Sequence, residues 1–410
     1  MTRMRIKHFG PIGPGRLDND GWIDFKPVTL FIGNQGAGKS TVAKLFATFC
    51  WIEKALVRGD FEKKWFERKG RFKNKFLGYH RLENYQKGET SIEYEGDAYA
   101  ISYAGGQLSI RELSSQQYAL PQVMYVPAER NFISYVRHTR ELKLSSESLQ
   151  EFLTAFDQAK QSLRGSMTLP INNIEIEYDK LNDIINLRGQ GHKVRLTDAA
   201  SGFQSFVPVY LVSQHLANLV QNQSKNDQPA MSTDEMTRFK KAVASIFAND
   251  ILTDEQKRVA MSVLSNRFNK TAFINIVEEP EQNLFPSSQW DLLKNLLAFN
   301  HQGPQNQLVL TTHSPYIVNY LSLAIQGRQL QQRMQAAGRI DLLPELYKLI
   351  PESALLVADE VAIYQCDEQE GRISQLGCYE GIPSDQNLLN DWLRMGNSLF
   401  DQLLELEEAI

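Results

Sequence analysis

Cysteines, long apolar runs and net charge are all scarce in this sequence of 410 residues. The cysteines are Cys50, Cys366 and Cys378, and an odd, widely spaced set of this kind argues against a disulfide framework and against a zinc site. No stretch approaches the ~18 consecutive apolar residues that a membrane helix needs. The first residues also lack the apolar core of a signal peptide. These absences predict a cytoplasmic protein that is not embedded in a membrane.

The charged residues nearly balance, with 44 Lys and Arg against 48 Asp and Glu, for a net charge of -4. This balance gives no overall attraction to nucleic acid or to an acidic membrane, so such binding would require a local basic patch. The apolar fraction of 42% is typical of a folded globular protein, and the length allows two or more domains.

Short β-branched runs and longer amphipathic segments both occur, which predicts an α/β fold. Near the N-terminus, residues 5–9, 22–25 and 28–32 have the composition of strands, and residues 90–111 resemble an antiparallel meander. Further strands are predicted at 123–126, 175–178, 184–187, 194–196, 273–277 and 308–311, and a terminal hairpin at 361–366 and 372–376. Helices are predicted from near Gly38, after Gly202, and at 142–163, 235–247, 253–266, 289–299, 317–325 and 387–407. The polar residues 221–234 predict a loop.

A glycine-rich loop follows the strand at 28–32 and fits the pattern G-x-x-x-x-G-K-[ST]. Glycines let backbone N–H groups turn toward phosphates without a side-chain clash, and the start of the next helix adds a partial positive charge. In this pattern Lys39 contacts the β- and γ-phosphates and Ser40 binds Mg²⁺. The predicted ATP-binding residues are Gly33, Asn34, Gln35, Gly36, Ala37, Gly38, Lys39, Ser40 and Thr41.

Two further strands end in polar residues that suit the other side of an ATP site. Glu278 and Glu279 follow the strand at 273–277, and His313 follows the strand at 308–311. If a parallel strand beside the phosphate-loop strand carries the acids, Glu278 holds Mg²⁺ through a water and Glu279 orients or deprotonates the attacking water. His313 can then reach the γ-phosphate. Taken alone, the acids also fit a solvated loop, and a lone histidine is usually structural.

A serine–glycine pair, Ser201 and Gly202, stands where a helix is predicted to begin. A helix N-terminus with a hydroxyl group is an anion site, and this one lies far along the chain from the phosphate loop. A second group that binds the γ-phosphate is useful if it comes from the other copy of a dimer. By itself, the pair is better explained as an ordinary helix N-cap.

Together these segments resemble the ABC-ATPase superfamily, on the side of the RecF, SMC and OLD proteins, and within it the AAA15/AAA21 group. The residues that match its motifs are Lys39 in Walker A, Glu278 and Glu279 in Walker B, Ser201 and Gly202 in the signature motif, and His313 in the switch. The runs Glu-Glu-Pro-Glu-x-Asn-Leu-x-Pro at 278–286 and Val-Pro-Ala-Glu-Arg at 126–130 are typical of the group. The resemblance implies an α/β P-loop NTPase head of the ABC type, with a mixed sheet, an N-terminal antiparallel β subdomain and a helical insertion.

Three features depart from the superfamily pattern. Glu278 stands where Walker B usually has Asp, the signature lacks its full Leu-Ser-Gly-Gly-Gln form, and Glu129 and Arg130 occupy the place of the Q-loop glutamine. The long separation between the signature and Walker B implies a helical insertion near residues 221–270. The predicted domains are an N-terminal lobe at 1–135, a signature-bearing helical subdomain at 136–270 and a C-terminal lobe at 271–410.

Members of this group often serve anti-phage defence. The resemblance includes the ATPase subunits of the PARIS and Septu systems, which act with a separate nuclease or effector. It implies an ATP- and Mg²⁺-dependent hydrolase, whose turnover the longer side chain of Glu278 can slow. It also implies a homodimer or higher homo-oligomer that closes around ATP and controls a separate effector. After His313, no spaced acids indicate an attached TOPRIM nuclease.

A basic aromatic segment at residues 54–81 supports an alternative function. Basic side chains interleaved with aromatic ones suit phosphate backbones and stacked bases, which would fit a RecF-like repair ATPase that binds DNA. The candidate DNA contacts are Lys63, Lys64, Arg68 and Lys69. The competing interpretation is an amphipathic helix whose aromatic residues pack on the core, and for the aromatic residues we favour it. A transporter subunit is a third possibility, which the acidic run at 278–281 and the long insertion disfavour.

Overall fold

A computed structural model describes residues 2–114, 118–135, 146–189, 191–225, 233–248, 264 and 270–408. The chain folds around a seven-stranded sheet with the order β2-β16-β15-β4-β14-β13-β8. Its strands are β2 (Gly15–Arg16), β16 (Arg372–Gln375), β15 (Val361–Asp367), β4 (Val28–Gly33), β14 (Gln307–Thr312), β13 (Ala272–Glu278) and β8 (Pro121–Val126). The five strands from β15 to β8 are parallel, whereas β16 runs antiparallel to β15, so the sheet is mixed as predicted.

Both faces of the central sheet are covered, because its strands are apolar on both sides. Along β4, Leu30 and Ile32 pack into one core, and Phe31 between them packs into the other. The strand β14 alternates in the same way. This is the pattern of a parallel sheet enclosed in a three-layer α/β fold. The helix α1 (Lys39–Arg58) lies in the second core, and the helices α3 (Glu147–Ser162), α4 (Ser201–Lys225), α7 (Pro286–Asn300) and α8 (Pro315–Ala336) contribute to the first.

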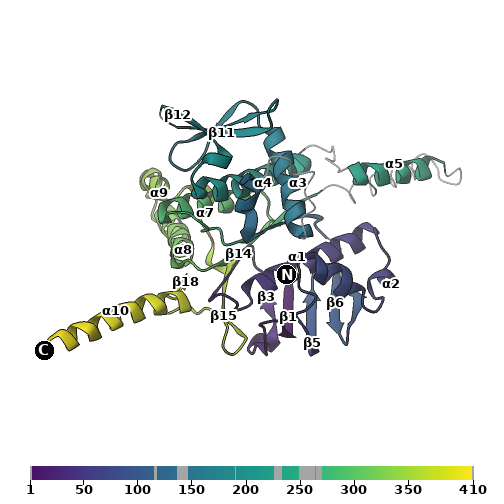
Figure 1. The fold of residues 1–410 in the computed structure, drawn as a ribbon, viewed down its shortest axis with the longest axis horizontal. Coiled ribbons are helices and arrows are strands. Elements are labelled where there is room, and N and C mark those ends of the chain that lie inside the picture. The colour runs from purple at the N-terminus through teal and green to yellow at the C-terminus, as the bar shows by residue number, and fades with distance from the viewer. Residues whose placement is uncertain are drawn as a thin grey trace.

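An antiparallel sheet of five strands forms the predicted N-terminal β subdomain. Its order is β3-β1-β5-β6-β7. The strands are β1 (Arg3–Phe9), β3 (Ile23–Asp24), β5 (Gln86–Glu95), β6 (Tyr99–Ala104) and β7 (Gln107–Glu112). Figure 1 shows these strands gathered next to α1, on the side of the molecule opposite α7 and α9.

A smaller antiparallel sheet and several helices complete the fold. The small sheet consists of β9 (Ser166–Thr168), β10 (Glu175–Asp179), β11 (Ile184–Gly189) and β12 (His192–Arg195), and a two-stranded ribbon consists of β17 (Cys378–Tyr379) and β18 (Ile382–Pro383). The remaining helices are α2 (Lys63–Phe66), α5 (Thr233–Phe247), α9 (Leu343–Leu349) and α10 (Leu388–Glu408), with a π-helical turn at Phe72–Leu77. Short 3-10 turns lie at Asn19–Gly21, Ala128–Tyr135, Leu196–Asp198, Ile340–Leu342, Glu352–Ala354 and Ala358–Glu360. Within the described ranges, no helix combines the length and the apolar character needed to cross a membrane.

Most predicted elements occur within a few residues of their predicted bounds, and three differences matter. The polar residues 221–225, predicted as loop, continue the helix α4, since tertiary packing extends a helix beyond its apolar pattern. The Walker B strand β13 does not lie beside the phosphate-loop strand β4, because β14 pairs with both. The predicted terminal hairpin β15–β16 occurs, and its position, which was not predicted, is inside the central sheet, where β15 pairs in parallel with β4 along its length. The helix predicted at 253–266 lies almost wholly outside the described residues.

The division at residues 135 and 270 stays a prediction. The central sheet draws β2, β4 and β8 from the first predicted segment and β13 to β16 from the third. These two segments therefore share a single sheet. The small sheet β9–β12 and the helices α3 to α5 all come from the segment between them.

The buried Glu53 fixes α1 against the N-terminal sheet. Only 3% of the residue is exposed, and its carboxylate accepts hydrogen bonds from the Tyr94 hydroxyl at 2.6 Å, the Ala98 N–H at 2.7 Å and the Tyr99 N–H at 3.0 Å. Burial raises the pKa of this carboxyl group, and the same hydrogen bonds oppose the rise. One acid thus satisfies three donors at the turn between β5 and β6.

We expect Glu53→Ala to lower the free energy of unfolding by roughly 2–4 kcal/mol, because buried donors lose their acceptor. Urea unfolding followed by circular dichroism measures the change. The exposed Glu89→Ala, whose side chain is 86% exposed, serves as the control and should change stability by less than about 0.5 kcal/mol. Equal effects of the two substitutions would contradict the role of Glu53.

Candidate functional site

The phosphate loop connects β4 to the start of α1, as the sequence predicts. Gly33, Gly36 and Gly38 adopt positive φ angles of 148°, 76° and 98°. A Cβ atom on Gly33 would lie 2.3 Å from the carbonyl oxygen of Cys366 on the neighbouring strand β15. A glycine is therefore required there both for its backbone angle and for the close approach of β15. The resulting loop can direct backbone N–H groups toward a phosphate.

The amine of Lys39 is hydrogen-bonded to the loop that precedes it. It is only 5% exposed, and its Nζ donates to the carbonyl oxygens of Gly33 at 2.9 Å and Asn34 at 2.8 Å. The same nitrogen lies 3.1 Å from Nε2 of His313. Burial lowers the pKa of Lys39, while the acids at the end of β13 oppose this. The amine is thus held over the loop, at the place where a bound phosphate would compete for it.

Glu278 ends β13 with its side chain buried. One of its oxygens, Oε2, accepts from the Ala128 N–H at 3.3 Å, and the other, Oε1, has no hydrogen-bond partner of regular geometry. The Tyr125 hydroxyl lies near this carboxylate, which adds to the effect of burial in raising the pKa of Tyr125. A buried carboxylate oxygen without a donor suits a cation or a cation-bound water. The free oxygen of Glu278 is compatible with its predicted Mg²⁺ role, and the pairing of Glu278 with Ser40 stays a prediction. The described residues hold no cluster of three or more metal-binding side chains that would form a separate metal centre.

Glu279 and His313 face each other next to Lys39. Nε2 of His313 lies 3.7 Å from Oε1 of Glu279, and both side chains are about one-third exposed. Glu279 has a φ of 44°, a left-handed conformation that is uncommon outside glycine and that is fixed by its N–H, which donates to the Thr311 carbonyl. Burial, then the charge of Glu278, raises the pKa of Glu279. Burial, then the charge of Lys39, lowers the pKa of His313, which favours the neutral ring.

Glu281 is a further acid of this site whose role the sequence did not assign. Its Oε1 accepts the N–H of His313 at 2.7 Å, and burial raises the pKa of its carboxyl group. The bond ties the residues after β13 to the residues after β14. The sequence shows Glu281 in the Glu-Glu-Pro-Glu run. Its hydrogen bond with the His313 N–H, however, depends on β14 lying next to β13, which the sequence does not show.

Arg130 is buried, although the sequence placed it at a nucleotide-facing Q-loop. Its guanidinium donates to the carbonyl oxygens of Glu278 at 2.6 Å, Glu279 at 2.5 Å and Ser205 at 3.3 Å. Burial lowers the pKa of Arg130 to about 10, so it stays charged at neutral pH. Arg130 therefore holds the backbone of Walker B and the signature helix together. Glu129 is exposed, and its charge contributes to the raised pKa of Glu279.

Ser201 and Gly202 begin α4 as predicted, with Ser201 exposed. The first residues of α4 pack against the segment that follows β13 in the same chain. A Cβ atom on Gly202 would lie 3.0 Å from the Asn283 carbonyl oxygen, and the Asn283 amide donates to the Ser205 hydroxyl at 3.0 Å. Among the described residues, no hydrogen bond joins Ser201 to the phosphate loop. The prediction that this pair acts in trans stays a prediction.

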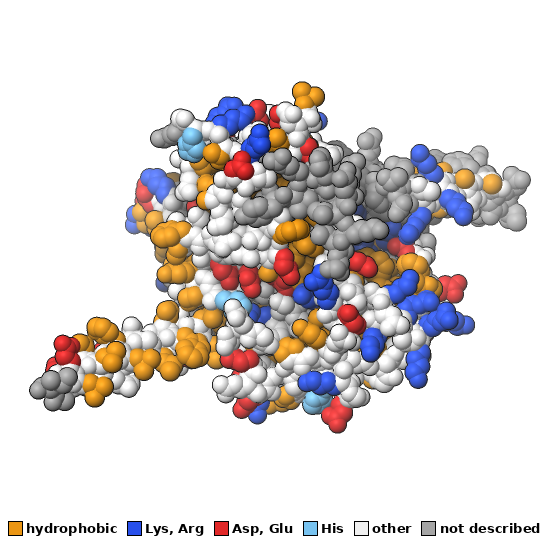
Figure 2. Space-filling view, in the orientation of Figure 1, with side chains coloured by type: hydrophobic (Ala, Val, Ile, Leu, Met, Phe, Trp, Pro, Cys, Tyr) orange, Lys and Arg blue, Asp and Glu red, His pale blue; other side chains and the backbone are white. Residues whose placement is uncertain are grey.

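The aromatic residues of the basic segment pack into the protein. Phe66 and Phe72 are fully buried in the second core, and Trp65 stacks on Phe61 with ring centroids 4.1 Å apart. Arg71 lies over the Trp65 ring, 4.1 Å from its centroid. This arrangement favours the packing interpretation of the aromatic residues. The exposed basic side chains form a blue area over α2 in Figure 2.

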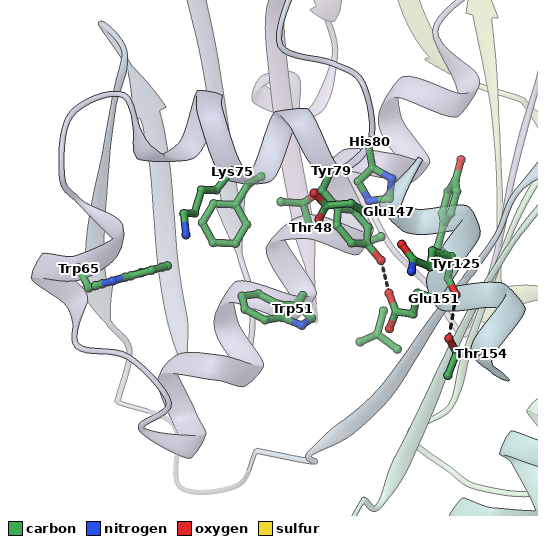
Figure 3. A pocket seen from close by; sticks show the side chains of 14 residues that line it. Thr48, Trp51, Trp65, Lys75, Tyr79, His80, Tyr125, Glu147, Glu151 and Thr154 are labelled. Atoms are coloured by element: carbon green, nitrogen blue, oxygen red, sulfur yellow. Dashed lines mark hydrogen bonds between the residues drawn. The ribbon is translucent and has the colours of Figure 1, made fainter. Parts of the chain in front are cut away.

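An open cavity of about 890 Å³ separates this segment from α3. Figure 3 shows Trp51, Trp65 and Lys75 on one side, and His80, Tyr125 and Glu151 on the other. The Tyr79 hydroxyl donates to Glu151 across it. His80 stays neutral, because burial lowers its pKa to about 3. The cavity does not include the residues of the phosphate loop.

Comparisons with known proteins agree with the motifs. The AAA ATPase domain family matches residues 254–318, which include Glu278, Glu279 and His313. No curated protein matches the chain.

Among solved structures, an SMC head domain from Thermotoga maritima is 13% identical, with a TM-score of 0.34, over 78% of this chain and 90% of that one. An Smc head domain from Pyrococcus furiosus, bound to the C-terminal domain of ScpA, is 10% identical, with a TM-score of 0.32, over 98% and 100%. An ATP-binding cassette bound to ADP and Pi is 8% identical, with a TM-score of 0.30, over 92% and 100%. Because these TM-scores are low, the structural matches carry no functional argument, and the functional conclusion rests on the residues of the site itself.

We expect Arg130→Met to reduce ATP turnover by about 10²-fold, because the Walker B backbone loses the group that positions Glu279. Binding of a fluorescent ATP analogue should persist, since the hydrogen bonds of Arg130 go to carbonyl oxygens outside the phosphate loop. The control Arg164→Met, at an exposed position, should retain turnover. Full activity of a folded Arg130→Met protein would show that Arg130 has no positioning role.

Proposed function

We propose that this protein is an ATP-driven switch that closes as a homodimer around ATP and controls a separate effector protein in anti-phage defence. The observation that carries the proposal is the convergence of Lys39, Glu279 and His313 at one end of the sheet, with Ser201 exposed at a helix start. ATP binding and hydrolysis are the part with most support. The dimer, the effector and the biological setting rest on the resemblance set out above.

The side chains of the site have complementary tasks. Lys39 would exchange its loop carbonyls for phosphate oxygens, and the loop N–H groups would bind the remaining oxygens. Ser40 and Glu278 would hold Mg²⁺, which supplies positive charge to the phosphates when bound. Glu279, with its raised pKa, would accept a proton from the attacking water. The neutral His313 would donate a hydrogen bond from its ring N–H to the γ-phosphate.

The exposed position of Ser201 supports the proposed dimer. The tip of α4 begins with the exposed Ser201, which presents a hydroxyl group, and the tip packs against the segment after β13 of its own chain. A second copy could place this tip over the γ-phosphate of the first. Arg130 bonds both Ser205 and Glu279, so closure around ATP would be coupled to the position of the catalytic glutamate. Hydrolysis would remove the shared γ-phosphate and favour the open state.

We expect Glu279→Gln to bind ATP and to reduce phosphate release by about 10²–10⁴-fold, because the general base is lost. When combined with Leu399→Glu and Leu403→Glu on the exposed helix α10, so that ATP is the source of any assembly, it should also gain one copy in mass on addition of ATP, measured by light scattering after size exclusion. Lys39→Ala should lose ATP binding and this gain. Adding Ser201→Arg to Glu279→Gln should keep ATP binding and abolish the gain. Unchanged phosphate release in Glu279→Gln would remove Glu279 from its role.

A RecF-like DNA-binding ATPase is the second candidate, because Lys64, Arg68 and Lys69 are exposed on one segment. Lys63 is partly engaged, since it pairs with Glu112 at 3.0 Å. This surface would contact a phosphate backbone rather than stack bases, since the neighbouring aromatic residues are packed inward.

If DNA binds there, replacing Lys63, Lys64, Arg68 and Lys69 by Gln should reduce the slope of log K against log salt by roughly 3–4. Fluorescence anisotropy with duplex DNA and ATP measures it. Neutralising Arg188 and Lys193, on the small sheet, should leave the slope unchanged. Absence of binding by the unaltered protein at low salt would exclude this function.

A further inference from the structure

The helix α10 is an amphipathic arm without a covering partner among the described residues. Figure 1 shows it extending away from the rest of the molecule, and Figure 2 shows hydrophobic side chains along its length. Every residue from Asp391 to Glu408 is exposed. The large apolar side chains include Trp392 and Phe400, which are 63% and 62% exposed, and Leu403 and Leu406, which are 63% and 66% exposed. A row of large, exposed apolar side chains on one helix normally marks a surface that contacts another molecule.

The base of α10 is fixed to the ATPase core, so the direction of the arm is defined. Asn387 is 2% exposed, and its side chain accepts the N–H groups of Leu389 and Asn390 as an N-cap. The Leu388 N–H donates to the side chain of Gln365 on β15 at 2.9 Å. Because β15 pairs with β4, the arm is rooted one strand away from the phosphate loop.

The apolar residues of α10 repeat with the alternating three- and four-residue spacing of a coiled coil. The seam consists of Leu389, Trp392, Gly396, Leu399, Leu403 and Leu406. Phe400 flanks it on one side. No proline interrupts the helix, whose 21 residues span about 31 Å.

We propose that α10 pairs with α10 of a second copy as a short antiparallel coiled coil. In the antiparallel register that uses the whole helix, Trp392 lies opposite Leu403 of the second copy, and Gly396 lies opposite Leu399. These two layers then each combine a larger side chain with a smaller one, as interdigitated packing requires, and Leu389 lies opposite Leu406. The arrangement is self-complementary, as a two-fold interface must be.

The charges of α10 select the antiparallel orientation. Four of its five carboxylates lie in the last half of the helix, at Asp401, Glu405, Glu407 and Glu408. Parallel pairing would place both acidic ends together, whereas antiparallel pairing separates them. It also brings each acidic end toward the positive N-terminal end of the other helix. The two ATPase cores then lie at opposite ends of the pair and do not collide.

This pairing goes beyond the proposed function, because it requires no nucleotide and uses a surface other than the phosphate loop and Ser201. Two ATPase cores would already be tethered before ATP binds. Tethering raises the effective concentration of the second copy for any ATP-dependent contact.

The first test is the mass of the full-length, nucleotide-free protein by sedimentation at micromolar concentration. We expect twice the monomer mass of 46.8 kDa. Leu399→Glu with Leu403→Glu should halve it, and Asn397→Glu with Ser398→Glu, on the polar face, should not. A monomeric unaltered protein, or a dimeric Leu399→Glu/Leu403→Glu variant, would overturn the proposal. ATP binding by that variant, and its gain in mass with ATP when combined with Glu279→Gln, report separately on the proposed function.

The second test is the orientation, in a Cys378→Ser background that removes the exposed cysteine. The double variant Trp392→Cys/Leu403→Cys should form a disulfide-linked dimer under mild oxidation. Each single variant should not, because identical positions lie roughly 16 Å apart along an antiparallel pair. Cross-linking of Trp392→Cys alone would indicate a parallel pair and contradict the proposed geometry.

Discussion

The guanidinium of Arg130 is the contact on which the geometry of the candidate site depends. It is buried, and its donors are used on carbonyl oxygens of two elements that are far apart in the chain, the end of β13 and the first turns of α4. A buried cation without these acceptors would be costly, so its burial and its hydrogen bonds require each other. By fixing the Glu278 and Glu279 carbonyls, it sets where their carboxylates point. By holding Ser205, it makes the exposed tip of α4 part of the same rigid unit.

Sheet order explains how the remaining groups meet. Because β14 lies between β4 and β13, His313 stands between Lys39 and Glu279 and contacts both. Parallel strands place their carboxyl ends at one edge, which gathers residues from three distant parts of the chain. Burial at that edge then changes the pKa values of these side chains. Burial raises the pKa of Glu279 and lowers that of His313, which suits a proton acceptor beside a neutral donor.

The two surfaces that we propose to contact other copies are both connected to the phosphate loop. Ser201 is joined to Walker B through Ser205 and Arg130. The base of α10 is joined to β15, and the turn after β15 reaches the loop through the hydrogen bond from Asn34 to Glu368. Nucleotide binding can therefore bias both surfaces, since each is attached to a strand or loop that lines the site. The aromatic side of the basic segment differs, because its rings are used in packing.

The sequence by itself determined the local features. The glycine pattern with Lys39 and Ser40, the strands ending at Glu278 and Thr312, and the helix start at Ser201 all follow from short-range composition and backbone preference. Only the tertiary structure decided the neighbours: that β14 separates β4 from β13, that the hairpin at β15 joins the central sheet, and that Arg130 is buried under Walker B. These depend on contacts between residues far apart in the chain. Arg130 bonds residues 75 and 148 positions away. The first residue of β4, Val28, pairs with Leu308 of β14 and Val361 of β15, which are 280 and 333 positions away. Periodicity records which face of an element is apolar, but not which other element covers it.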